Sequence, residues 1–130
     1  MKVFADTFYW IALTDSTDAS HLRALQVTDE IITTDEVLTE YLTFFSGAPE
    51  FMRREVALAV DDILQNPTVK VIAQSRESFL DGLKLYRDRP DKGYSLTDCI
   101  SMQTMRREGL TEVLTNDRHF EQEGFRALFR

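Results

Sequence analysis

The chain has 130 residues and a mass of 15.1 kDa, which is typical of a single domain, so we expect residues 1–130 to fold as one unit. A hydrophobic content of 43%, with only 5 Gly and 3 Pro, excludes disordered, collagen-like and low-complexity chains. Acidic residues outnumber basic ones by 22 to 15, and the net charge of −7 argues against overall electrostatic attraction to nucleic acid. A phosphate-bearing substrate would need positive charge supplied locally.

Cysteine content and the absence of targeting segments indicate a compartment. Cys99 is the only cysteine, so no internal disulfide can form, and we expect it to be a small core residue. Residues 1–12 lack the charged, apolar and small-residue regions of a secretory signal, and no run approaches the ~18 consecutive apolar residues of a membrane span. We therefore expect a cytoplasmic protein with no membrane partner.

Short apolar runs alternate with longer segments of helical periodicity, which is typical of a parallel sheet covered by helices on both faces. Strands are expected at 3–5, 31–33, 69–72 and 113–115, with a fifth at the edge of the sheet over 125–129. Helices are expected at 7–13, 21–28, 33–45, 49–65, 75–87 and 95–108, with a last turn from 116 to 120.

Local signals mark several helix ends and faces. Thr33 with Glu36, and Ser95 with Asp98, have the spacing of capping boxes, and Gly109 is expected just beyond the helix that Ser95 begins. Several aromatic and aliphatic side chains recur at helical spacing and are expected to pack inward. They are Val37, Leu38, Tyr41, Leu42, Phe44 and Phe45, then Phe51, Val56, Leu58, Ala59, Val60, Ile63 and Leu64, then Phe79, Leu83 and Tyr86.

Acidic residues follow two of the expected strands. Asp6 comes directly after the first strand and Asp117 within three residues of the fourth, so parallel strands would place both at one edge of the sheet, where ligands bind in open α/β folds. Two carboxylates at one edge suggest a cation site, although each alone is more typical of a turn or a helix cap. Asp98 likewise has a plain role as the acid of its capping box.

Glu40 lies at the border of the apolar face of its helix when residues are placed about 100° apart. A glutamate at such a border can reach either water or a cleft. Glu36 faces away from the apolar side chains and is expected to be solvated, so Glu40 is the better candidate for a site.

Four stretches of the sequence resemble the PIN-domain ribonucleases, and more closely the VapC-type toxins of type II toxin–antitoxin systems. The resemblance spans nearly the whole chain, and its last two stretches are the most specific. The stretches are Val3-Phe4-Ala5-Asp6-Thr7, Thr33-Thr34-Asp35-Glu36-Val37-Leu38-Thr39-Glu40, Tyr94-Ser95-Leu96-Thr97-Asp98-Cys99 and Leu114-Thr115-Asn116-Asp117-Arg118-His119-Phe120.

The resemblance implies a PIN-like α/β fold, a three-layer α/β/α sandwich around a mainly parallel sheet of about five strands. It also implies a metal site in which an acid follows the first strand, the second strand's helix supplies a Glu, a later helix opens with an Asp and a last Asp follows the fourth strand. By position, these catalytic and metal-binding residues are Asp6, Glu40, Asp98 and Asp117. Asp35 and Glu36 also lie near the register expected for the Glu.

The activity implied is that of an Mg²⁺-dependent endoribonuclease, the toxin of a toxin–antitoxin pair. A small antitoxin that covers the site, often with a basic side chain among the carboxylates, and a homodimer formed through helices are the implied partners. A PIN-like module that has lost catalysis and binds other proteins is the alternative, and the presence of all four acids speaks against it. A haloacid dehalogenase-type phosphatase is excluded because Phe8 stands where that family needs a second Asp.

The chemistry of such a site follows from its charge. Mutual repulsion among four carboxylates raises the pKa of at least one, and Mg²⁺, with Mn²⁺ as a substitute, prefers such oxygen ligands. We hypothesise that Asp6, Asp98 and Asp117 ligate the ion while Glu40 orients the attacking water or holds a second ion. Hydrolysis by water predicts products with 5′-phosphate and 3′-hydroxyl ends.

Other polar and aromatic residues are assigned plainer roles. Arg87, Arg89 and Lys92 border the expected cleft and are candidate RNA contacts, although such side chains are usually solvated surface. His21 and His119 are expected to cap turns or lie on the surface. Three aromatic residues that follow Asp6 are expected in the core or an interface rather than stacked on a base, and these are Phe8, Tyr9 and Trp10.

Overall fold

The computed structural model describes all residues, 1–130, as five strands and seven helices. The strands are β1 (Lys2–Ala5), β2 (Glu30–Thr34), β3 (Val69–Ile72), β4 (Glu112–Leu114) and β5 (Arg126–Ala127). The helices are α1 (Thr7–Thr14), α2 (His21–Leu25), α3 (Asp35–Phe44), α4 (Glu50–Gln65), α5 (Arg76–Asp88), α6 (Leu96–Glu108) and α7 (Arg118–Gln122). Every expected element is present. β5 is shorter than predicted because its only partner, β4, is itself three residues long.

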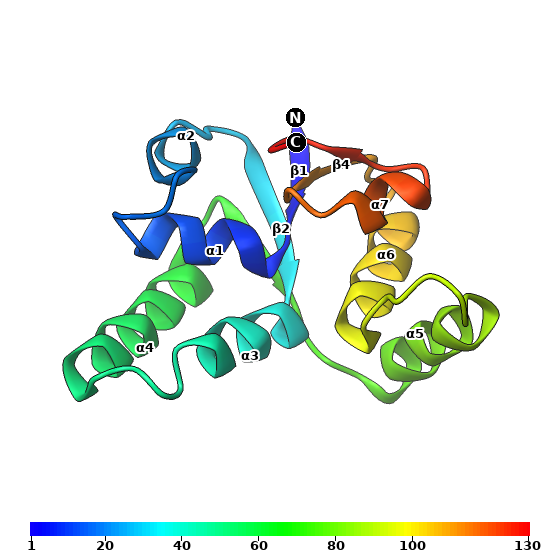
Figure 1. Ribbon diagram of the computed structural model, residues 1–130, viewed down its shortest axis with the longest axis horizontal. Helices are drawn as coiled ribbons and strands as arrows, with labels where there is room; N and C mark the ends of the chain where they lie inside the picture. Colours follow the sequence, from blue (N-terminus) through cyan, green and yellow to red (C-terminus); the bar gives the residue numbers. More distant parts are fainter.

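The strands form one sheet in the order β3-β2-β1-β4-β5, and every neighbouring pair is parallel. Helices α1 to α4 lie on one side of the sheet and α5 and α6 on the other (Figure 1). This arrangement confirms the predicted three-layer α/β/α sandwich with a parallel sheet of five strands. No helix is both long enough and apolar enough to cross a bilayer.

The strand order reverses at β1. From β1 the chain builds outward through β2 to β3, then returns to place β4 on the other side of β1. In open parallel sheets, the crevice outside the carboxyl ends of the strands at such a reversal is where ligands bind. The carboxyl ends of β1 and β2 point down in Figure 1, toward the starts of α3 and α6.

The core follows from the burial of the central strands and the helices against them. Phe4 and Val113 of neighbouring strands are fully buried, and Cys99 of α6 is buried as predicted. Tyr9 and Trp10 are also buried, in agreement with their assignment to the core. The indole nitrogen of Trp10 donates to the hydroxyl of Thr33 in β2 at 3.4 Å, which ties α1 to the sheet.

The buried face of α5 differs from the prediction. Ser78, Gly82 and Leu85 face inward, whereas Phe79 and Tyr86 are exposed. The cause is a close approach between α5 and α6, because a Cβ on Gly82 would lie 2.4 Å from Ile100 Cγ1 and 3.1 Å from the Ile100 amide nitrogen. Small residues at the contact let the helices meet there, and the large side chains are turned toward solvent.

The inward faces predicted for α3 and α4 are also only partly correct. Val56 and Ile63 of α4 are buried, but Phe51, Leu58 and Leu64 are exposed, because α4 contacts the rest of the molecule along a narrow strip. On α3, large side chains near its end are likewise exposed, namely Leu42 and Phe44. These helices therefore present apolar surface to solvent.

The capping residue of α3 lies one position later than predicted. Thr34, not Thr33, caps the helix, and its hydroxyl accepts from the Val37 amide at 3.1 Å. Thr33 is instead a buried strand residue whose hydroxyl donates to the Ala5 carbonyl at 2.9 Å. Glu36 was expected to be solvated, but its carboxylate instead accepts a hydrogen bond from the Ser78 hydroxyl at 3.2 Å.

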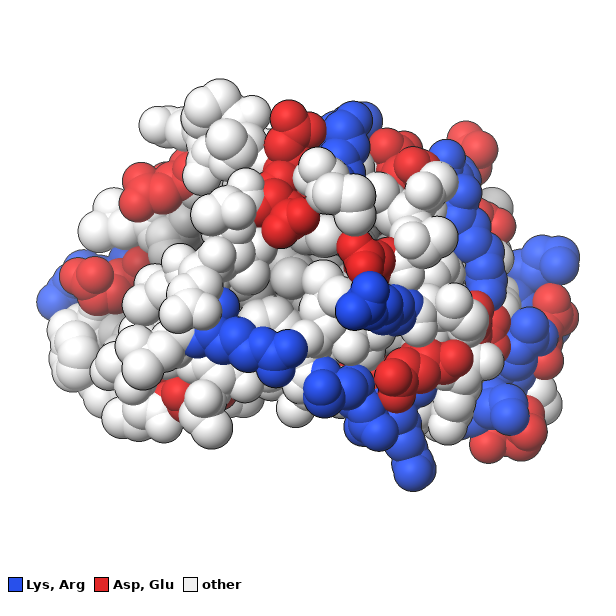
Figure 2. Space-filling view, turned by 90° about the horizontal axis from the view of Figure 1, so that it is seen from above, with Lys and Arg blue, Asp and Glu red and all other residues white.

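Basic side chains are unevenly distributed over this acidic protein. Most Lys and Arg residues occur from α5 onward. When the molecule is seen from above, they are more numerous on the right side (Figure 2). That half of the molecule also supplies Asp98 and Asp117. Asp98 and Asp117 therefore lie in a part of the protein that is richer in positive charge than the net charge of the whole chain suggests.

Candidate metal centre

Asp6 occupies the point where β1 ends and α1 begins. It is the N-cap residue of α1, but its side chain makes no capping hydrogen bond, so the carboxylate is free to face the crevice. Only 7% of the residue is exposed. Oδ2 accepts a hydrogen bond of 2.8 Å from the hydroxyl of Thr115, the residue after β4, so the two central strands meet at this carboxylate.

Asp98 lies in the first turn of α6 and completes the predicted capping box. Its Oδ2 accepts from the Ser95 amide at 3.0 Å, and its own amide donates to the Ser95 hydroxyl at 3.0 Å. The structural role proposed for Asp98 is therefore confirmed. It does not exclude a second role, because a carboxylate that accepts one hydrogen bond keeps other lone pairs that can bind a cation.

Asp117 caps α7 in a comparable way. Its Oδ1 accepts from the His119 amide at 2.9 Å, and its own amide donates to the Thr115 hydroxyl at 3.2 Å. Thr115 thus holds both Asp6, through Oδ2, and the backbone of Asp117. Sequence reasoning did not single out this threonine, although its place between β4 and Asp117 is a signal that it faces the site.

Glu40 reaches the same region from the border of α3. The Thr7 hydroxyl donates to Glu40 Oε1 at 2.5 Å, which joins α3 to the first residue of α1, next to Asp6. Glu40 also borders a polar hollow in the surface together with Thr39, Thr43 and Thr97. The structure therefore brings the four predicted acids to one end of the sheet, from the ends of β1 and β4, the middle of α3 and the first turn of α6.

The acids influence one another electrostatically. Burial raises the pKa of Asp6 to about 7, and the nearby charges of Asp98 and Glu40 add to the rise against the opposing hydrogen bond from Thr115. The pKa of Asp98 is also raised, first by burial and then by the charges of Asp117 and Glu40. These carboxylates repel one another in a partly buried site, and a bound cation would remove that repulsion.

His119 lies among the acids, which the sequence did not predict. Its Nδ1 is 3.4 Å from Asp117 Oδ1 and 3.8 Å from Asp98 Oδ2, and one potential ligand atom from each of the three residues lies within 4.8 Å of the others. Nδ1 is buried and has no hydrogen-bond partner. This orphaned atom beside two carboxylates fits a divalent cation, which accepts both oxygen and imidazole nitrogen ligands.

A network beside the site holds Tyr94 and the loop before α6. The side chain of Glu123 is 4% exposed and accepts from Tyr94 Oη at 2.9 Å, from Arg89 Nε at 2.9 Å and from Arg106 at 2.8 Å. Burial raises its pKa, but the hydrogen bonds from Arg106, Arg89 and Tyr94 outweigh burial and lower it. No feature of the sequence indicated this cluster.

The candidate RNA contacts are placed differently from one another. Arg89 forms an ion pair with Glu123, and Lys92 Nζ lies 3.9 Å from Asp91 Oδ2. Arg87 is exposed and pairs with no acid. Of the three, Arg87 alone is therefore free to meet a substrate without first breaking an ion pair.

Comparison with known proteins adds family and fold. A sequence model of the PIN domain family matches residues 3–125. The crystal structure of Mycobacterium tuberculosis VapC20, described as a sarcin–ricin loop cleaving toxin, superposes with a TM-score of 0.82 at 24% identity, over 95% of each chain. FitAcB from Neisseria gonorrhoeae gives a TM-score of 0.65 at 11% identity, over 98% of this chain and 96% of that one. A comparison with curated protein sequences gives no match. At these identities the structural similarities establish the fold.

Proposed function

The chain belongs to the PIN domain family, and from that premise we propose that it is a metal-dependent endoribonuclease in which Asp6, Glu40, Asp98 and Asp117 form the catalytic centre. The observation that carries this proposal is the convergence of these acids at the reversal of strand order, with the pKa values of Asp6 and Asp98 raised. Retaining such a cluster is unfavourable for the free protein. A divalent cation turns the same cluster into a binding site.

Mg²⁺ is the proposed cofactor and Mn²⁺ its substitute, because a set of carboxylates is the ligand environment that both ions prefer. Asp6, Asp98 and Asp117 would hold the ion. When bound, it would neutralise charge on the scissile phosphate and lower the pKa of a water molecule. It would also meet the need for local positive charge in a protein whose net charge is −7.

Glu40 would orient the attacking water. The hydrogen bond from Thr7 fixes Oε1 and thereby the direction of Oε2, which remains available to accept a proton from water. Attack in line with the P–O3′ bond would break that bond and expel the 3′ oxygen, which takes up a proton from solvent. Because water rather than the RNA 2′-hydroxyl is the nucleophile, the fragments should carry 5′-phosphate and 3′-hydroxyl ends.

We further propose that the protein is a VapC-type toxin acting on RNA in the cytoplasm. Similarity over 95% of the chain to VapC20, which is described as a sarcin–ricin loop cleaving toxin, supports this assignment. RNA contacts would come from the basic half of the molecule, with Arg87 as the unpaired candidate. Unpaired bases are the usual target of sequence-specific RNA recognition, so loops are the expected sites of cleavage.

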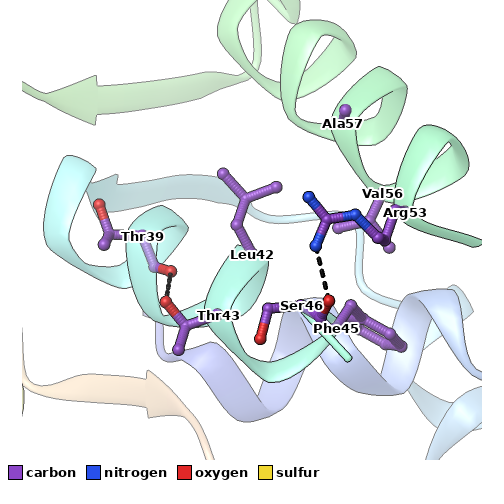
Figure 3. Close-up of a pocket in the computed structure, with 8 residues that line it drawn as sticks. All are labelled: Thr39, Leu42, Thr43, Phe45, Ser46, Arg53, Val56 and Ala57. Carbon is purple, nitrogen blue, oxygen red and sulfur yellow. Dashed lines mark hydrogen bonds between the residues drawn. The ribbon is translucent and has the colours of Figure 1, made fainter. Parts of the chain in front are cut away.

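An antitoxin is the first proposed protein partner. Helices α3 and α4 enclose a surface groove of about 400 Å³, into which Leu42 points from α3 while Arg53 and Val56 approach from α4 (Figure 3). Arg53 donates to the Ser46 carbonyl at 2.6 Å and so fixes the turn between the helices. The same two helices also expose Phe44 and Phe51, which adds to the apolar surface that a partner helix would cover.

A homodimer formed through helices is the second proposed partner interaction. Helix α5 exposes the large side chains of Phe79, Leu80 and Tyr86. Exposure of this apolar surface to water is unfavourable, and a dimer interface would bury it. Leu80→Asp should lower the molar mass measured by light scattering from dimer to monomer, whereas Asp91→Asn, an exposed change outside α5, should leave it unchanged. A wild-type protein that is monomeric at high concentration would refute the dimer.

The activity is tested by incubating purified, antitoxin-free protein with total RNA, with and without Mg²⁺, and mapping the fragment ends. We expect cleavage that needs the metal and that Asp6→Asn and Asp98→Asn abolish, while Asp91→Asn cleaves normally. Fragments ending in 2′,3′-cyclic phosphate would refute the mechanism. A protein that neither cleaves RNA nor binds Mg²⁺ in a carboxylate-dependent manner would instead be the inactive binding module.

A further inference from the structure

We propose that His119 is a direct ligand of the divalent cation through Nδ1, so that the centre combines an imidazole nitrogen with its carboxylates. This inference rests on the proposed metal centre and adds a residue that the four acids do not include. Its consequence is a preference among metals that a centre of carboxylates alone would not have.

The geometry around Nδ1 is that of neighbouring ligands. Ligands at adjacent corners of an octahedron with bonds of about 2.1 Å lie about 3 Å apart. Nδ1 is 3.4 Å from Asp117 Oδ1 and 3.8 Å from Asp98 Oδ2, so a small movement of these side chains would bring all three atoms to one ion. Both separations are too long for a good hydrogen bond, so neither carboxylate already satisfies the nitrogen.

The orphaned state of Nδ1 supports a missing partner. The His119 side chain keeps 25% of its surface exposed, yet Nδ1 itself is buried and has no hydrogen bond. In the neutral imidazole with its proton on Nε2, Nδ1 carries a lone pair, and the exposed part of the ring can be hydrated. A buried acceptor without a partner is unfavourable, and a cation at this position would satisfy it.

The ring is held in this orientation from two sides. Its own backbone amide donates to Asp117 Oδ1 at 2.9 Å, which fixes the first turn of α7. The imidazole ring also contacts the Tyr94 ring, with 5.1 Å between the ring centroids and 60° between the ring planes. Tyr94 is fixed in turn by its hydroxyl on Glu123. Partners that orient a ligating histidine in this manner are a common part of metal sites.

A nitrogen ligand changes which ions the centre prefers. Mg²⁺ favours oxygen ligands, whereas imidazole suits transition metals, whose affinities for mixed nitrogen and oxygen sites rise from Mn²⁺ through Co²⁺. The centre should therefore hold Mn²⁺ and Co²⁺ more tightly than Mg²⁺, and His119 should account for much of the difference. Removing the imidazole should cost Mn²⁺ affinity about tenfold and leave Mg²⁺ affinity within about threefold.

The test is pulsed electron paramagnetic resonance of Mn²⁺ bound to tag-free protein, which detects ¹⁴N in the coordination sphere independently of any activity. The chain has two histidines, so an imidazole signal has only two sources. His21 is the matched control, because its Nδ1 lies 2.7 Å from the Ala12 carbonyl and is thereby already satisfied. We expect a ¹⁴N coupling in the wild type and in His21→Gln, and its loss in His119→Phe, which keeps a ring against Tyr94.

The possible results separate this inference from the proposed function. Mn²⁺ that binds in a manner dependent on Asp98 but shows no ¹⁴N coupling would overturn the role of His119 and leave the metal centre standing. A coupling that persists in His119→Phe, or in His119→Gln if the Phe variant does not fold, would overturn it equally. Absence of any carboxylate-dependent Mn²⁺ binding would refute the proposed metal centre itself, and this inference with it.

Discussion

Replacing Asp6 by Asn should stabilise the metal-free protein at neutral and alkaline pH. The pKa of Asp6 is raised from 3.8 to about 7 in the folded state, first by burial and then by the charges of Asp98 and Glu40. Between these two pH values the folded state binds a proton that the unfolded state has lost. Asp6 therefore does not lower the free energy of unfolding below pH 4. As the pH rises from 4 toward 7, ionisation of this carboxylate lowers the free energy of unfolding progressively.

The size of the effect follows from the pKa values of the unfolded and folded states. A tenfold difference in proton affinity between the two states corresponds to about 1.4 kcal/mol, so a rise in the pKa from 3.8 to about 7 lowers the free energy of unfolding by about 4 kcal/mol above pH 7. Asn is neutral, keeps nearly the same shape and can still accept from Thr115. Asp6→Asn should therefore recover most of this energy at pH 8, and for a protein of this size that corresponds to a rise in Tm of about 10 °C.

Thermal and urea unfolding in EDTA at pH 4 and pH 8 measures the effect. We expect wild type and Asp6→Asn to have similar stability at pH 4 and to differ strongly at pH 8, while the exposed control Asp91→Asn follows the wild type at both. Adding Mg²⁺ at pH 8 should stabilise the wild type and not Asp6→Asn. A variant that is no more stable than the wild type at pH 8 would refute the claim that burial and neighbouring charges make the ionised Asp6 carboxylate destabilising.

Three further changes test other parts of the structure. Thr115→Val removes the hydroxyl that holds Asp6, and calorimetry should show Mg²⁺ affinity reduced by tenfold or more, with the fold intact by circular dichroism. Glu123→Ala leaves two partly exposed arginines without their buried partner and should lower the free energy of unfolding by about 2 kcal/mol in urea. Gly82→Ala places a Cβ against the backbone of Ile100 and should lower it by about 1–3 kcal/mol despite the better helix propensity of Ala.

Each of these has a result that would contradict it. Unchanged Mg²⁺ affinity in Thr115→Val would mean that this hydroxyl does not position Asp6. A neutral Glu123→Ala would mean that desolvation of the carboxylate cancels its ion pairs. A stabilised Gly82→Ala would show that α5 and α6 can move apart easily, contrary to their close approach.

Much of the fold was predictable because its signals are local. The strand Val69–Ile72 has the bounds that were predicted from its short apolar run. Ser95 and Asp98 form the capping box that their spacing indicated. The face of α5 was not predictable. Periodicity favoured the large side chains, whereas the packing is decided by the approach of Gly82 to Ile100, a contact between separate helices.

The candidate site shows the same division. Asp6 and Asp117 could be placed at one edge because parallel strands end there together, and the helical position of Glu40 allowed it to reach the cleft. His119 could not be identified from sequence, because its role depends on the three-dimensional position of Nδ1 between two carboxylates. The Glu123 network joins residues that only tertiary packing brings together.

We propose that acids from both ends of the chain meet to hold one divalent cation. Anomalous X-ray diffraction from crystals soaked in Mn²⁺ tests it most directly. We expect a strong peak bounded by Asp6, Asp98 and Asp117, with Glu40 beside it. A fully occupied Mn²⁺ peak elsewhere on the molecule, with no density among these carboxylates, would contradict it.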